Sequence, residues 1–153
     1  MIMKGPIALS ILTIFISLSA FSQEKSTLYN KSLADSLGAD SYGMKMYSFV
    51  LLKTGPVKVD KATSDSLFRG HMANINRLAD AGKLVVAGPF GANDLTYRGL
   101  FILNAPVQEA PALLESDPAI KAKLLEATIV PWYGSAALPL YLPYHEKIQK
   151  TAP

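Results

Sequence analysis

The chain has 153 residues, a formal net charge of +3 and no cysteine. This length is enough for one compact domain. A balance this close to neutral does not support nucleic-acid binding, which calls for Lys and Arg clustered on one face. The absence of cysteine excludes disulfides and thiol chemistry, so stability must come from the core and from association.

The first 22 residues have the pattern of a cleaved secretory signal peptide. Lys4 gives a short positive start, residues 6–20 are almost uninterrupted apolar sequence, and Ala20-Phe21-Ser22 supplies small residues at a cleavage site. The alternative is an uncleaved membrane anchor, but the run is short for a span of about 20 residues. We therefore expect an exported protein, periplasmic or secreted, with no stable membrane span after cleavage.

Residues 23–42 are polar and rich in small side chains, so they are interpreted as an N-terminal lead-in with room for a short helix over residues 32–37. The first strand is predicted over residues 45–53, because aromatic and β-branched side chains fill it and charges bracket it. A polar connection over residues 57–64 follows, and its last residue or Asp65 can cap the next helix.

A helix is predicted over residues 67–81. Its apolar side chains recur at helical spacing and form one stripe for packing on a sheet: Phe68, Met72, Ile75 and Ala79. His71 belongs to the adjoining row, at the border of the buried face, where a side chain can be both held and reached. Gly82 ends the helix.

A β-hairpin is predicted next. Residues 84–87 form a short apolar strand that Gly88-Pro89 breaks, residues 91–94 supply turn chemistry, and residues 97–103 return as a strand.

Residues 107–125 have a helical pattern with two interruptions. Pro111 suits the first turn of a helix through residue 114. Asp117-Pro118 restarts the chain as an N-cap followed by a first helical residue, which predicts a second short helix over residues 119–125. The last core strand is predicted over residues 126–133.

This order is β-α-β-β-α-β, an α+β ferredoxin-like plan over residues 43–134 with a C-terminal tail over residues 135–153. Two helices cover one face of the sheet and leave the other face open, yet both faces of the first strand are apolar. A two-fold homodimer that packs sheet against sheet, a dimeric α/β-barrel-type assembly, is the economical solution. We expect the tail to cover what remains.

Four short motifs follow one another in a fixed order: the strand at 44–53, Gly70-His71-Met72 in the helix, the segment 82–89, and Ser116-Asp117-Pro118. Together they resemble the YciI-like proteins, the family of the YCII-related domain, over roughly residues 44–134. The resemblance implies a dimeric ferredoxin-like fold whose active site pairs a histidine of the first helix with an aspartate before the second. These positions correspond to His71 and Asp117. The signal peptide, lead-in and tail depart from the minimal cytoplasmic members.

A histidine hydrogen-bonded to a carboxylate has one tautomer favoured and its imidazolium stabilised, which suits general acid–base chemistry. His71 and Asp117 are therefore the candidate catalytic residues, for lyase or isomerase chemistry that needs no cofactor. The alternatives are a histidine that only packs at the helix border and an aspartate that only caps a helix. Capping is compatible with orienting a histidine.

An apolar pocket beside His71 is expected, with candidate lining residues Tyr47, Phe49, Gly88, Phe90, Phe101 and Trp132. The glycine would let a ligand approach the backbone closely. Core packing of the aromatic side chains and a simple strand end at Gly88 are the alternatives. No metal site is expected, because the chain has two histidines and no cysteine. A serine-based triad has no support either, since no G-x-S-x-G elbow is present.

The leading hypothesis is thus a small, cofactor-free enzyme of the cell envelope that acts on a small molecule through a His71–Asp117 dyad. The alternative is a non-catalytic dimeric module that binds a small molecule in the same pocket. A structural envelope protein is a third possibility, and it predicts no pocket beside His71.

Overall fold

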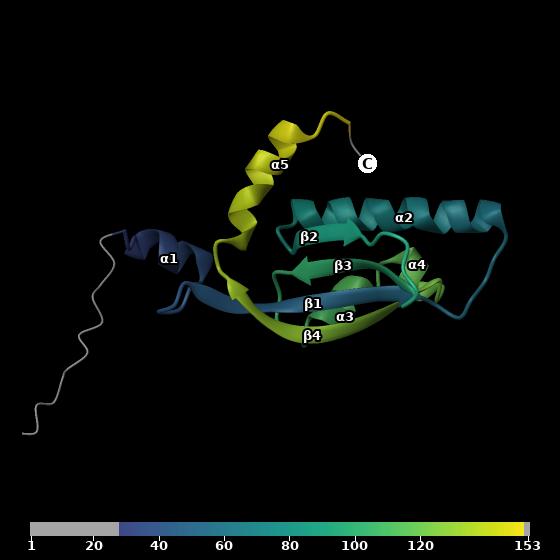
Figure 1. The fold of residues 1–153 in the computed structure, drawn as a ribbon, viewed down its shortest axis with the longest axis horizontal. Helices are drawn as coiled ribbons and strands as arrows, with labels where there is room; N and C mark the ends of the chain where they lie inside the picture. The colour runs from purple at the N-terminus through teal and green to yellow at the C-terminus, as the bar shows by residue number, and fades with distance from the viewer. Residues whose placement is uncertain (1–27, 152–153) are drawn as a thin grey trace, which may run out of the picture.

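The computed structural model describes residues 28–151 (Figure 1). The predicted signal peptide at residues 1–22 and the first part of the lead-in lie outside these residues. Within residues 28–151, no helix combines the length and the apolar character that a membrane crossing requires.

A four-stranded antiparallel sheet forms the centre of the fold, in the order β2-β3-β1-β4. Its strands are β1 (Met44–Thr54), β2 (Leu84–Pro89), β3 (Tyr97–Leu103) and β4 (Leu125–Ser135). The two central strands are β1 and β3, and helices connect β1 to β2 and β3 to β4, which is consistent with the predicted ferredoxin-like plan. The four predicted strands and the hairpin are confirmed.

β2 is longer than predicted, since it continues through Gly88 and Pro89 instead of breaking there. Both residues pair with β3, Pro89 opposite Gly99. Proline is tolerated because β2 is an edge strand, where one side of the backbone needs no partner.

Helix α2 (Lys61–Asp80) begins well before the predicted start at residue 67. Its N-cap is Asp60, whose side chain accepts a hydrogen bond from the Thr63 backbone N–H at 3.0 Å, rather than Ser64 or Asp65. The first turns carry only small and polar side chains, so no apolar periodicity marks them. The Asp60 cap and the Lys61–Asp65 ion pair are the local interactions that support these first turns.

The interrupted region forms two short helices, α3 (Ala110–Leu114) and α4 (Pro118–Lys121), as predicted in outline. The predicted extension of the second helix to residue 125 is wrong. Lys123 adopts a left-handed backbone with φ of 58°, which ends the helical path, and β4 begins at Leu125.

The termini of the described chain are helical. The lead-in contains α1 (Lys31–Leu37), capped by Asn30 and ended by Gly38 with φ of 69°. The tail forms a 3-10 turn, η1 (Leu138–Tyr141), and then α5 (Leu142–Ile148). In Figure 1 α5 rises from the end of β4 on the side of the sheet where β2 and α2 lie.

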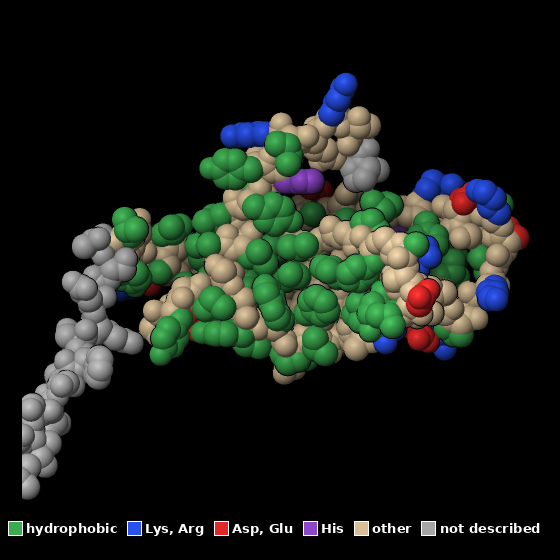
Figure 2. Space-filling model, in the orientation of Figure 1, with side chains coloured by type: hydrophobic (Ala, Val, Ile, Leu, Met, Phe, Trp, Pro, Cys, Tyr) green, Lys and Arg blue, Asp and Glu red, His purple; other side chains and the backbone are tan. Residues whose placement is uncertain are grey.

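The core lies between the sheet and the helices, and its most buried members include Val50, Leu52, Leu78, Phe101, Leu103 and Leu114. Among residues 28–151, no helix lies over the opposite face of the sheet. The expectation that the tail covers this face is wrong, because the tail packs against β2 and lines the cavity beside α2. On the open face, Val130 is 43% exposed and Trp132 37%. Figure 2 shows hydrophobic side chains gathered over this side of the molecule. The fold therefore leaves an apolar sheet face open in the single chain.

Candidate active site

His71 lies in the middle of α2 with only 8% of its surface exposed. Its ring stacks on Phe101 of β3, with 5.8 Å between centroids and 24° between planes. Phe68, one turn earlier on α2, meets the ring edge-on at 5.9 Å and 83°. These two contacts restrict the orientation of the imidazole plane.

Asp117 holds one nitrogen of that imidazole. Its Oδ2 lies 2.6 Å from Nδ1 of His71, and the aspartate is completely buried. Its Oδ1 accepts hydrogen bonds from the backbone N–H groups of Ala119 at 3.0 Å and Ile120 at 3.2 Å, which caps α4. One carboxylate thus begins a helix and orients the histidine, so the two roles considered for Asp117 coexist.

Asn74 is a further member of the site that was not predicted from the sequence. Its Nδ2 donates to Oδ2 of Asp117 at 3.3 Å. Its Oδ1 accepts from Arg77 at 2.8 Å and from the Ser116 hydroxyl at 2.9 Å, which fixes the orientation of the amide. The available signal was its position three residues after His71, because residues at this spacing are neighbours on one helix face.

A close approach of two helices makes the pair possible. A Cβ atom at Gly70 would lie 2.5 Å from Cγ of Pro118, a distance that real atoms do not tolerate. The missing side chain lets α4 sit directly against α2, with Asp117 one residue before the contact and His71 one residue after Gly70. Gly70 therefore sets the separation on which the 2.6 Å contact depends.

The protonation state of Asp117 follows from its surroundings. Burial by itself raises the pKa of the carboxyl group, but the hydrogen bond and charge of His71, the Ile120 backbone N–H and the Asn74 amide together outweigh it. The net result is a pKa below the ordinary value of 3.8. Asp117 is a carboxylate at neutral pH and can only accept hydrogen bonds. Nδ1 of His71 must then be the donor, and in the neutral ring the free lone pair is on Nε2.

The second nitrogen, Nε2, is not used by the part of the protein that the structure describes. Within residues 28–151, Nε2 of His71 forms no hydrogen bond, and no enclosed side-chain nitrogen or oxygen is left without a partner. Nε2 is therefore reachable from the cavity that His71 lines. The cavity measures about 860 Å³ and lies between α2, the β2–β3 hairpin and α5. Such a volume suits a small organic molecule.

The expected lining residues divide between the two faces of the sheet. Gly88 and Phe101 line the cavity together with His71. Tyr47, Phe49 and Trp132 do not, because side chains alternate along a strand and these three lie on the open face.

The strand register shows this division directly. Phe101 pairs with Val50 on the helix side, whereas Phe49 pairs with Ile102 and Tyr47 with Trp132 on the other side. Phe90 follows the end of β2, is 39% exposed and packs near Tyr97 instead.

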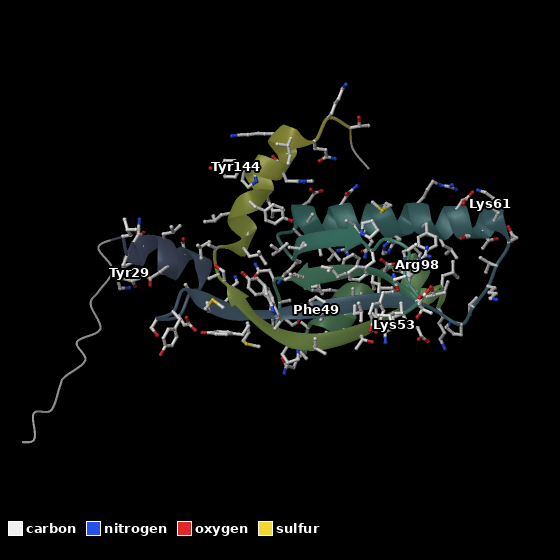
Figure 3. The ribbon with its side chains drawn as sticks, viewed as in Figure 1. Tyr29, Phe49, Lys53, Lys61, Arg98 and Tyr144 are labelled. Carbon is white, nitrogen blue, oxygen red and sulfur yellow. The ribbon has the colours of Figure 1, made fainter. Side chains whose placement is uncertain are left out.

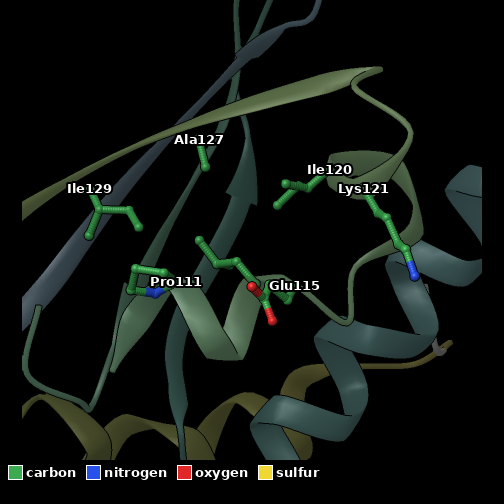
Figure 4. A pocket seen from close by; sticks show the side chains of 7 residues that line it. Pro111, Glu115, Ile120, Lys121, Ala127 and Ile129 are labelled. Atoms are coloured by element: carbon green, nitrogen blue, oxygen red, sulfur yellow. The ribbon is translucent and has the colours of Figure 1, made fainter. Parts of the chain in front are cut away.

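A second hollow of about 510 Å³ lies between α3, α4 and β4 (Figure 4). It is lined by apolar side chains with Glu115 and Lys121 at its edge. Neither His71 nor Asp117 reaches it, so it is separate from the candidate site. In the described part of the chain, no three histidine or carboxylate side chains come together in a way that would hold a metal ion.

The chain was compared with protein-family models, curated proteins and solved structures. No family model matches the chain, and no curated protein matches it. Among solved structures, the chain is similar to a 5-chloro-2-hydroxyhydroquinone dehydrochlorinase from Burkholderia phenoliruptrix in complex with 2,5-dihydroxybenzoquinone. The identity is 22%, the TM-score is 0.38, and the match covers 56% of this chain and 90% of that chain. A likeness at this level does not assign a reaction to this chain.

Proposed function

We propose that the chain is an exported YciI-like protein that catalyses proton transfer on a small molecule, with His71 as general base and acid and Asp117 as its orienting partner. The order of the sequence motifs and the β-α-β-β-α-β topology support the family assignment. The observation that carries the catalytic assignment is that the two imidazole nitrogens of His71 have different surroundings. Nδ1 is held by a buried carboxylate, and Nε2 is left for a ligand in the cavity.

The reaction would proceed in two proton transfers. Nε2 of neutral His71 removes a proton from an acidic C–H or O–H group of the bound molecule, and the resulting imidazolium is stabilised by the Asp117 carboxylate at Nδ1. The same nitrogen then returns the proton, either to another atom of the substrate in an isomerisation or to a leaving group in an elimination. Neither route changes the net number of protons on the enzyme.

The surroundings of the pair favour this chemistry. The Phe68 and Phe101 rings pack on the imidazole and His71 is only 8% exposed, so the charge that develops on the ring is largely shielded from water. Charge interactions are stronger where water is excluded. Positioned acid–base catalysis of this type contributes about 10²–10⁴-fold to a rate.

Hydrogen–deuterium exchange tests the proposal without knowledge of the product. Small cyclic ketones and 1,3-dicarbonyl compounds are incubated with the protein in D₂O, and loss of their acidic C–H signals is followed by proton NMR. We expect faster exchange with the wild type and a loss of about 10²–10⁴-fold in His71→Ala. Lys31→Ala, on the exposed helix α1, is the control and should exchange like the wild type. Compounds that bind without any exchange would favour the non-catalytic binding module instead.

The open sheet face supports a second part of the proposal, which is association into a homodimer through that face. Its apolar side chains are only partly covered in the single chain, and a two-fold partner would bury them. Light scattering of the purified protein should give the mass of a dimer at micromolar concentration. A monomer under these conditions would contradict it.

A further inference from the structure

The C-terminal tail supplies one wall of the cavity. Its contributing side chains are regularly spaced along α5 and its C-cap: Leu142, His145, Glu146 and Gln149. Residues at i, i+3, i+4 and i+7 share one face of a helix. The helix therefore turns a single continuous face toward the space that His71 lines.

The other face of α5 is turned to solvent. Tyr144 is 68% exposed and Ile148 is 80% exposed. The Lys147 ammonium group lies 5.5 Å from the centre of the Tyr144 ring on that outer side. Figure 3 labels Tyr144 on the part of α5 that projects away from the sheet. His145, Glu146 and Gln149 are exposed as well, so the first face differs from the outer face in that it lines the cavity.

Tyr141 fixes the start of α5 to the sheet. Its hydroxyl donates a hydrogen bond to the backbone carbonyl of Val85 in β2. Its ring also lines the cavity and meets the His145 ring edge-on, with 6.4 Å between centroids and 71° between planes. The tail is therefore hydrogen-bonded to β2, a strand that forms part of the cavity wall. His145 packs against the tyrosine that makes this hydrogen bond.

Both histidines of the chain consequently line one cavity, although they are 74 positions apart in the sequence. Resting on the proposed function, we propose that α5 is part of the substrate site and that His145 contacts the molecule on which His71 acts. His145 is then a specificity-determining residue, because the tail limits the size and polarity of what fits beside His71.

The walls define the chemistry of that molecule. Nε2 of neutral His71 is an acceptor, so the ligand must offer an O–H, N–H or acidic C–H group to it. The apolar side chains around the histidine favour a hydrocarbon or aromatic body. Charged groups of both signs line the cavity: Asp80, Arg98 and Glu146. Their charges largely offset one another, so the site does not select for a strongly charged ligand. A small, mainly apolar, neutral molecule with one weakly acidic proton meets these conditions.

A matched pair of probes tests the proposal, namely 4-methylphenol, which carries such a group, and toluene, which lacks it. Because the chain has two histidines, proton NMR of the purified protein shows one imidazole Hε1 signal from each. His145→Gln assigns them. We expect 4-methylphenol to shift both signals along one saturation curve, and toluene to bind more weakly.

Three variants sharpen the result. His145→Ala should weaken 4-methylphenol binding by about two- to tenfold, the value of one ring contact. Tyr144→Ala, on the outer face, should bind like the wild type. Tyr141→Phe removes the hydroxyl that joins the tail to Val85 and should reduce the response of His145 while the response of His71 persists.

The outcomes separate this inference from the proposed function. A shift of the His71 signal alone, with unchanged binding in His145→Ala, would overturn the role of α5 and leave the His71 site intact. A probe that shifts neither signal would overturn both.

Discussion

The carboxylate of Asp117 binds Nδ1 of His71 with one oxygen, at 2.6 Å, and caps α4 with the other. The start of a helix and the orientation of the imidazole are thus properties of one buried side chain. Any change at this position is expected to affect stability and chemistry together, and well-chosen variants separate the two effects.

Asp117→Asn is the first such variant. Asparagine is as good an N-cap as aspartate, so α4 should persist. The buried hydrogen bond from His71 would lose its charged acceptor, and we predict a decrease of about 1.5–3 kcal/mol in the free energy of unfolding. Proton exchange on the responsive carbon acids should fall as well. Asp60→Asn, at the exposed cap of α2, is the matched control and should leave exchange unchanged. Equal exchange in Asp117→Asn and the wild type would contradict the dyad.

The pH dependence of stability should report the same carboxylate. The pKa of Asp117 in the folded protein lies below its ordinary value of 3.8, because hydrogen bonds and the charge of His71 outweigh burial. Its stabilising contribution is therefore complete above that ordinary value and is lost as the pH falls through the lower folded value. Urea unfolding from about pH 6 to about pH 2 should show the gap between wild type and Asp117→Asn closing at the acid end. A difference in stability between the two proteins that grows toward low pH would contradict a lowered pKa of Asp117.

Gly70→Ala tests the approach of α2 to α4. Alanine is favoured over glycine in a helix interior by about 0.5–1 kcal/mol, so helix propensity alone predicts stabilisation. The new methyl group would collide with Pro118, and we predict lower stability and a displaced α4. Ser66→Ala, exposed on the same helix, gains propensity without a collision and should be slightly more stable than the wild type. A Gly70→Ala protein with raised melting temperature would show that the helices can move apart at no cost.

Val130→Lys tests the open sheet face. The side chain is 43% exposed in the single chain, so a lysine there should leave the monomer folded. In the proposed dimer it would place a charge at the centre of an apolar interface, and we predict a monomer by analytical ultracentrifugation. Val57→Lys places the same charge in a loop where the native side chain is 40% exposed, and it should leave association unchanged. If Val130→Lys and Val57→Lys form dimers equally well, the dimer interface does not include the open sheet face.

Much of the fold could be predicted because its signals are local. In the strands, apolar residues alternate with polar ones or form continuous runs, and both patterns are visible in the sequence. Asp117-Pro118 is recognisable as a helix start because aspartate is a good N-cap and proline suits the first helical position. The beginning of α2 was not predictable from periodicity, since its first turns contact no core and carry no apolar stripe. The continuation of β2 through Pro89 depends on its position at the sheet edge, which only the strand order reveals.

The site was predictable in part for the same reason. His71 and Asp117 stand out by residue type and by their positions at a helix border and a helix start. Asn74 is ordinary in sequence and acquires its role from Asp117, 43 positions away. The faces of Tyr47 and Phe49 depend on strand register, which the sequence does not state, and so three aromatic residues were assigned to the wrong side. His145 reaches the cavity only because η1 turns the tail back over β2.

The tautomer of neutral His71 tests the central claim most directly. A long-range ¹H–¹⁵N correlation spectrum, recorded at a pH where the ring is neutral, identifies which imidazole nitrogen carries the proton. We predict a proton on Nδ1, donated to Asp117, and an unprotonated Nε2. A proton on Nε2 in the wild type would contradict it, because Nδ1 and the Asp117 carboxylate would then be two acceptors in contact and no base would face the ligand.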